Sequence, residues 1–168
     1  MTDADVRSER IRRYLDDADA AIERHVARQG DFDEGRRAID SALQAMYRAF
    51  NGLNGQPAFW DRADADDGLT LQALIYVRGR MEHDVLVESH EEQPTLPGDD
   101  VPPSDDLLPG STFRWLPWEA MKPFMVANYG RDKKPLVEAY VAGEYVLPTL
   151  YRGLSHLRTE LSLSEGHE

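Results

Sequence analysis

Two amphipathic stripes at the start of the chain constrain its fold more than any other feature. Over about 5–29, apolar side chains recur at steps of three and four, the spacing of one helix face: Ile11, Leu15, Ala18, Ile22 and Val26. A second stripe follows Gly30 over about 33–53, with Asp33 as the expected N-cap: Ile39, Leu43, Met46, Phe50 and Leu53. Two long helices joined by so short a turn are expected to form an antiparallel hairpin.

The next segment predicts a third helix. Phe59 and Trp60 lie in the connection and are expected to plug the end of the hairpin. We expect a helix over about 67–89. The residues expected on its inner side are Leu71, Leu74, Val77 or Arg78, Met81 and Val85. Its second half also suits a strand, because IYV and VLV favour extended structure. We expect a helix throughout.

The second half of the chain predicts a loop, an irregular segment and a last helix. Five prolines interleaved with acids in 91–110 predict an exposed, mobile loop. The aromatic segment that follows predicts irregular or edge-strand structure, anchored on the helices by Trp115, Trp118 and Phe124. A helix over about 134–163 should be kinked or divided by Pro148.

These elements together predict an all-α fold in a single domain spanning 1–168. We expect a bundle of four to five helices, with the long proline-rich acidic insertion and the short irregular or edge-strand segment before the last helix.

The charge distribution narrows the classes of function. The net charge is −12, and residues 88–110 alone hold seven acids and no Lys or Arg. No basic stripe is visible along the chain, which argues against a high-affinity nucleic-acid binder. The chain lacks cysteine, its first residues do not resemble a signal peptide, and no apolar run could span a membrane. We therefore expect a cytoplasmic protein, and the preference for arginine over lysine suggests a bacterial or phage genome.

One short segment could carry chemistry. No nucleotide-binding, metalloprotease, calcium-loop or serine-hydrolase motif is present, and the five histidines are too far apart for a compact metal cluster. We expect no metal and no cofactor. What remains is the segment from Arg78 to Asp84, which places Arg78, Arg80, Glu82 and His83 within two helical turns.

This segment resembles the Arg-x(4–6)-His signature of the HEPN superfamily of all-helical domains. Arg78 and His83 have four residues between them, late in the third helix after two long antiparallel helices. The resemblance implies a metal-independent endoribonuclease, perhaps of a toxin or defence system. His83 would be the general acid or base and Arg78 the phosphate stabiliser, with Glu82 or Arg80 orienting them.

The resemblance also implies a homodimer with RNA as its substrate. Residues five apart on a helix are rotated by about 140°, so Arg78 and His83 do not share a face. In the superfamily, the motifs of two protomers meet in one cleft.

Two other classes of function remain open from the residues. The segment can be an ordinary solvated helix face with the i,i+4 pairs Arg78–Glu82 and Arg80–Asp84. The chain would then be a non-catalytic interaction protein that docks a protein partner through its acidic loop or a helical face. A third reading is an acidic decoy that mimics nucleic acid.

Overall fold

A computed structural model describes residues 3–28, 30–56, 59–81, 84–89, 113–125 and 133–166. The predicted loop over 91–110 lies outside these residues, as do Glu82 and His83. In the described part, helices predominate, and the only sheet has two short strands. The prediction of an all-α bundle is therefore confirmed.

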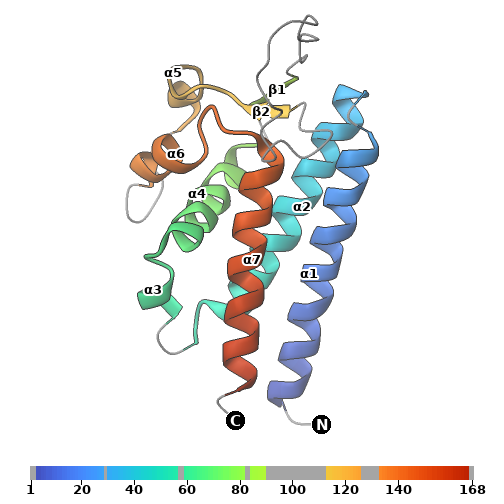
Figure 1. Cartoon of the computed structure of the whole chain (residues 1–168), viewed down its shortest axis with the longest axis vertical. Helices are drawn as coiled ribbons and strands as arrows, with labels where there is room; N and C mark the ends of the chain where they lie inside the picture. Colours follow the sequence, from blue (N-terminus) through green and yellow to red (C-terminus); the bar gives the residue numbers. More distant parts are fainter. Residues whose placement is uncertain are drawn as a thin grey trace, which may run out of the picture.

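Four helices form the body of the bundle. The helices α1 (Asp3–Ala27), α2 (Phe32–Leu53) and α7 (Val146–Glu165) run lengthwise beside one another, and α4 (Asp66–Met81) packs against α2 and α7 (Figure 1). The helices α1 and α2 form the predicted antiparallel hairpin. The chain begins and ends at the same end of the bundle (Figure 1). None of the helices in the described part is long and apolar enough to cross a membrane.

The hairpin departs from the sequence prediction in two details. The N-cap of α2 is Asp31 rather than Asp33, because the Asp31 side chain accepts a hydrogen bond (3.1 Å) from the Glu34 amide. On α1, Val26 is exposed, and His25 takes the buried position in its place. The preceding members of the predicted stripe are buried.

The core lies between α2, α4 and α7 and extends under α1. Its largest fully buried side chains come from the helices and from the strand that follows the insertion: Ile22, Ile39, Leu43, Met46, Leu53, Phe59, Leu71, Leu74, Met81, Leu86, Phe113 and Trp115. Gly153 permits the close approach of α7, since a Cβ there would lie 2.7 Å from Met46 Cε. The predicted leucine rhythm of the last helix is confirmed by the burial of Leu147, Leu150, Leu154, Leu157 and Leu161.

The expectation of one helix over 67–89 is wrong in its second half. The helix α4 ends at Met81, and Val87–Ser89 forms β1, which pairs antiparallel with β2 (Phe113–Trp115). Val85, predicted on the inner side, is 50% exposed, while Leu86 and Val87 are buried. The valines favour the extended conformation, and the partner strand beyond the insertion supplies the hydrogen bonds that make it stable.

Four short helical segments complete the fold. They are α3 (Phe59–Arg62), α5 (Trp118–Met121), the 3-10 turn η1 (Lys122–Phe124) and α6 (Lys134–Tyr140). The predicted anchor Trp115 is fully buried and Trp118 is half-buried, whereas Phe124 is exposed.

The last helix is divided, as the sequence predicts, but the break precedes the proline. The chain turns between α6 and α7 at Gly143, whose φ of 76° favours glycine. Pro148 then lies in the first turn of α7, where its missing N–H removes no helical hydrogen bond.

Candidate functional site

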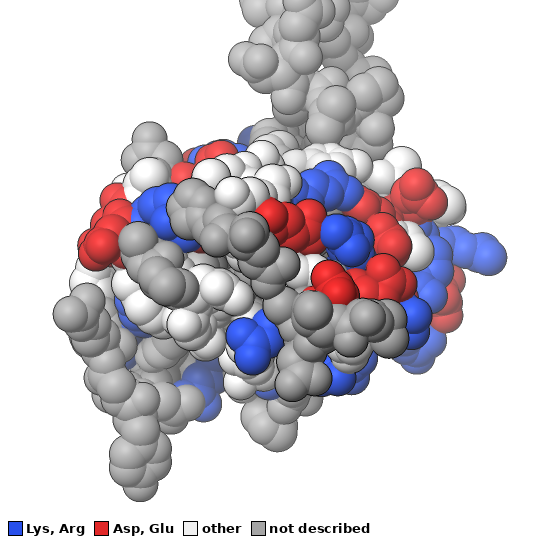
Figure 2. Space-filling view, turned by 90° about the horizontal axis from the view of Figure 1, so that it is seen from below, with Lys and Arg blue, Asp and Glu red and all other residues white. Residues whose placement is uncertain are grey.

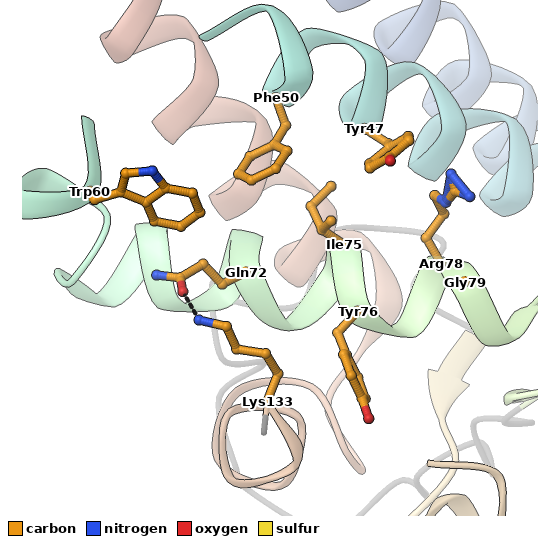
Figure 3. A pocket seen from close by; sticks show the side chains of 9 residues that line it. All are labelled: Tyr47, Phe50, Trp60, Gln72, Ile75, Tyr76, Arg78, Gly79 and Lys133. Carbon is orange, nitrogen blue, oxygen red and sulfur yellow. Dashed lines mark hydrogen bonds between the residues drawn. The ribbon is translucent and has the colours of Figure 1, made fainter. Parts of the chain in front are cut away.

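Arg78 of the predicted motif lies in the last turn of α4 and points toward α2. Its guanidinium carbon is 4.1 Å from the centroid of the Tyr47 ring, and its Nη1 donates a hydrogen bond (3.4 Å) to Gln44 Oε1. The cation–π contact with Tyr47 and the hydrogen bond to Gln44 together hold the guanidinium against α2. Arg78 is thus held on the wall of the groove between α2 and α4 (Figure 3).

The structure brings together only part of the predicted site. Arg80 is half-buried near the end of α4, two residues beyond Arg78. The Asp84 amide donates a hydrogen bond to the Arg80 carbonyl (3.0 Å). Glu82 and His83 lie outside the described residues, and their roles stay predictions. The homodimer also stays a prediction.

The groove beside Arg78 has a volume of about 390 Å³ and combines aromatic, amide and cationic side chains. Besides Arg78, its lining consists of Tyr47, Phe50, Trp60, Gln72, Ile75, Tyr76, Gly79 and Lys133. An adjoining hollow of about 430 Å³ shares Trp60, Gln72 and Lys133 and adds Asp64. Because the two hollows share these three lining residues, we call them together the α2–α4 groove.

A second cation reaches this groove from the residue before α6. The Lys133 ammonium donates a hydrogen bond to Gln72 Oε1 (Figure 3). Gln72 is buried and donates through Nε2 to the Ala63 carbonyl (2.8 Å), which sets the orientation of its amide. Sequence reasoning did not single out Lys133 or Gln72, because the two residues are 61 positions apart and only the fold joins them.

The third feature of the α2–α4 groove is an exposed tryptophan on a fixed support. The Trp60 side chain is 49% exposed, although the sequence predicted that it plugs the hairpin with Phe59. Phe59 does so and is fully buried. Trp60 instead packs edge to face on Phe50 and Phe59, with ring centroids 5.8 and 5.4 Å apart. A rigid, half-exposed indole can stack on a planar ring of a ligand.

The short helix that carries Trp60 is attached to α7 by a buried ion pair. Arg62 donates through Nε and Nη2 to both carboxylate oxygens of Glu160, which is 2% exposed. His156 lies one turn before Glu160 on α7, with its Nε2 3.9 Å from Glu160 Oε1. The pair holds α3, and with it Trp60, against the bundle.

Two buried histidines couple the stability of this fold to pH. His25 Nδ1 donates to the Gly35 carbonyl (3.0 Å). The Nε2 atoms of His25 and His156 are both buried without a hydrogen-bond partner among the described residues. Burial lowers the pKa of each imidazole below its ordinary value, more than the hydrogen bond to Gly35 or the charge of Glu160 raises it.

We expect the protein to lose stability as the pH falls below about 6.5, the pKa of an unfolded histidine. Because the folded-state pKa values are lowered, the unfolded chain binds more protons, so stability rises with pH and is lost on acidification. Each histidine contributes at most about 1.4 kcal/mol per pH unit. Urea unfolding at several pH values between about 7.5 and 5.5 measures the slope. The variants His25→Asn and His156→Gln should each reduce it, and a flat profile for the natural chain would contradict the prediction.

The α2–α4 groove can hold an anion beside a planar ring. A guanidinium and an ammonium approach it from two sides, and the rings of Tyr47 and Trp60 line it. Among the described residues, no cluster of three His, Asp or Glu could hold a metal ion. The four aspartates of the acidic insertion, Asp99, Asp100, Asp105 and Asp106, lie outside the described residues.

Comparison with protein-family models, with curated proteins and with solved structures gives no match to this chain.

Proposed function

We propose that this chain is an HEPN-like, metal-independent endoribonuclease of a toxin or defence system. The observation that carries the proposal is the position of Arg78, which the motif assigns to phosphate binding, on the wall of the α2–α4 groove. The groove offers what a nucleotide needs: cations for the phosphate from Arg78 and Lys133, and exposed aromatic surface for the base from Trp60.

The order of the helices supports the resemblance from which the proposal starts. Two long antiparallel helices, α1 and α2, precede α4, which carries Arg78 in its last turn, and α7 follows. Gly79 is exposed, and a Cβ at this position would meet no atom of the described residues within 4 Å. A side chain of a second protomer could therefore contact the Gly79 backbone directly, as the proposed dimeric active site requires.

The proposed reaction divides the work among four residues. His83 accepts the proton of a ribose 2′-hydroxyl, whose oxygen attacks the adjacent phosphorus. Arg78 neutralises the charge that builds on the phosphate. The protonated imidazole of His83 then acts as the general acid and gives a proton to the 5′-oxygen as the bond from phosphorus to that oxygen breaks, which leaves a 2′,3′-cyclic phosphate end. Arg80 and Glu82 are proposed to orient the two reacting groups. Because no metal takes part in this scheme, EDTA should not inhibit it.

Incubation of the full chain with structured RNA in EDTA tests the proposal. We expect cleavage that leaves cyclic phosphate ends and that falls by about a hundredfold or more in His83→Ala and in Arg78→Gln. The variants His90→Ala and Arg152→Gln are the controls, since neither residue belongs to the proposed site. The proposal would be contradicted if RNA stays intact at high protein concentration, or if both site variants still cleave it.

A second candidate function is favoured by the exposure of Trp60. A half-exposed tryptophan held rigidly at a groove is typical of residues that dominate protein–protein contacts. We propose a non-catalytic interaction protein as the alternative, with the α2–α4 groove as the helical face that binds a protein partner. In that case Trp60→Ala would abolish the protein's effect in cells and His83→Ala would leave it intact.

A further inference from the structure

Six exposed arginines line two hollows on the outer face of the α1–α2 hairpin. One hollow, of about 460 Å³, is lined by Arg7, Arg10 and Arg48 together with Tyr14, asparagines and glycines. The other, of about 300 Å³, is lined by Arg24, Arg28 and Arg37 with Glu34, Ala38 and Ser41. We call this surface, defined by the six arginines, the arginine face.

The helical repeat explains why the arginines gather on one side. Arg10 and Arg24 are 14 positions apart on α1, which is about four turns, and Arg28 directly follows the end of α1. Arg37 and Arg48 are 11 apart on α2, which is about three turns. Because the two helices are antiparallel, Arg48 lies across from the start of α1 and Arg37 across from its end. Charges of both signs cover the end of the molecule where α1 begins, with basic side chains along the lower edge of the view (Figure 2).

Most acids of α1 point away from the arginine face. Asp19 pairs with Arg158 of α7, and Glu9 pairs with Arg12 and Arg13. Asp17, seven positions from both Arg10 and Arg24, shares the side of the arginines by its spacing. In the linear sequence the arginines alternate with these acids, so no basic stripe is visible until the helix forms.

In the part of the chain that the structure describes, most arginines of the arginine face lack the carboxylate partners that other arginines have. Arg12 pairs with Glu165 (2.6 Å) and Arg62 with Glu160. On the arginine face, Arg37 alone pairs with a carboxylate, that of Glu34 at 3.0 Å. The other five form no ion pair with any residue that the structure describes. Six arginines with only Glu34 and Asp17 as nearby counter-charges repel one another, so in a chain of net charge −12 this arrangement points to an anion from outside.

The dimensions and composition of the arginine face fit the backbone of a duplex nucleic acid. From Arg10 to Arg24 the face extends about 21 Å at 1.5 Å per residue, which is roughly the axial length of six base pairs at the 3.4 Å step of B-form DNA. Among the described residues, the only aromatic ring that lines either hollow is that of Tyr14, which is half-buried. Single strands are usually held by stacking on aromatic rings, whereas duplexes are held through their phosphates.

We infer that the arginine face binds the phosphate backbone of a duplex segment of RNA. The choice of RNA over DNA rests on the proposed function, while the binding itself would also hold for a protein that does not cleave. Arg48 and Asn51 line the arginine face, and Tyr47 and Phe50, one position before each, line the α2–α4 groove. A hairpin whose stem lies on the arginine face would thus bring its single-stranded loop to Arg78.

Binding measurements with the full-length His83→Ala protein test this inference without cleavage of the probe. The change is the double substitution Arg10→Gln with Arg48→Gln, and the matched control is Arg152→Gln, an exposed arginine of α7 that lies 4.0 Å from Glu144. Fluorescence anisotropy over a range of salt concentrations gives the affinity for an RNA duplex of about a dozen base pairs. Circular dichroism verifies that all variants keep their helical content.

We expect the double variant to bind the duplex roughly tenfold or more weakly at about 0.1 M salt. The slope of log affinity against log salt should fall by about two, one for each lost phosphate contact, while the control changes neither quantity. An unchanged affinity and slope would overturn the inference. So would a single strand bound as tightly as the duplex, or a polyglutamate peptide bound more tightly than RNA, which would identify an acidic protein as the partner.

The outcome is separable from that of the proposed function. If duplex binding depends on Arg10 and Arg48 but the natural chain does not cleave RNA, the proposed role of the arginine face is supported and the proposed nuclease activity is contradicted. If cleavage depends on His83 but duplex binding does not depend on either arginine, the nuclease activity is supported and the role of the arginine face is contradicted.

Discussion

Replacement of Glu160 by alanine is expected to lower the free energy of unfolding by about 2–4 kcal/mol, because it breaks a largely buried ion pair. Glu160 is almost fully buried and accepts three hydrogen bonds from the Arg62 side chain, two from Nε at 2.7 and 3.0 Å and one from Nη2 at 2.5 Å. Its loss leaves the Arg62 guanidinium without its carboxylate beside a cavity. Since the Arg62 side chain is 35% exposed, water can solvate part of the released charge, which keeps the effect below that of a fully buried pair.

Urea unfolding of a small set of variants isolates this contribution. Glu160→Gln keeps the shape and one acceptor oxygen and should be less destabilising than Glu160→Ala. Glu138→Ala, an exposed carboxylate of α6, should change stability by less than about 0.5 kcal/mol. In the double variant Arg62→Ala with Glu160→Ala, the loss should be clearly smaller than the sum of the single losses. A loss under about 0.5 kcal/mol for Glu160→Ala would contradict the stabilising role assigned to the pair.

The same substitution should also disturb the α2–α4 groove. The helix α3 has only four residues and is held by the burial of Phe59 and by the Arg62–Glu160 pair. A helix so short is not stable by itself. Without the pair, Trp60 should become more exposed, and its fluorescence should shift to longer wavelength. Stability and groove structure are thus linked through one carboxylate.

The sequence predicted the features of this fold that depend on local periodicity. The hairpin of α1 and α2 follows from apolar residues at helical spacing, and the buried leucines of α7 follow from the same rule. Apolar residues at helical spacing predict the structure correctly where the face that they form is also the face that packs on the core. Val87 shows the opposite case, because the segment around it suited both helix and strand. Val87 is extended because it pairs with Trp115, which is 28 positions further along the chain and which local sequence patterns do not include.

The candidate site was predictable only where its residues lie close together in the sequence. Arg78 was found because the motif occupies two helical turns. Lys133 and Gln72, 61 positions apart, and Arg62 and Glu160, 98 positions apart, share no sequence signal. The arginine face was missed for another reason. Its members are near in sequence, but acids between them cancel the charge of any window, and only the helical repeat separates the two signs.

Replacement of Trp115 by alanine is expected to be the most destabilising single change, at about 3–5 kcal/mol. Trp115 is fully buried in β2, where its side chain belongs to the main core, and its amide donates to the Glu144 carbonyl (3.0 Å) in the turn before α7. Its indole Nε1 donates to Thr149 Oγ1 (2.8 Å), and that hydroxyl donates to the Val146 carbonyl (2.7 Å). The ring therefore fills the core and also joins the two-stranded sheet to the first turn of α7.

Conservative variants separate the two roles of Trp115. Thr149→Val keeps the volume but leaves the indole N–H buried without an acceptor, so it should lower the free energy of unfolding by about 1–3 kcal/mol. Trp115→Phe removes the indole N–H and part of the ring volume, while the Thr149 hydroxyl keeps its hydrogen bond to the Val146 carbonyl. When Thr149→Val is added to Trp115→Phe, its further effect should be smaller than in the natural chain, because no indole donor remains to be satisfied. Urea unfolding measures all four proteins. Equal effects of Thr149→Val in both backgrounds would show that the hydrogen bond does not contribute, and that Trp115 stabilises the fold by its volume alone.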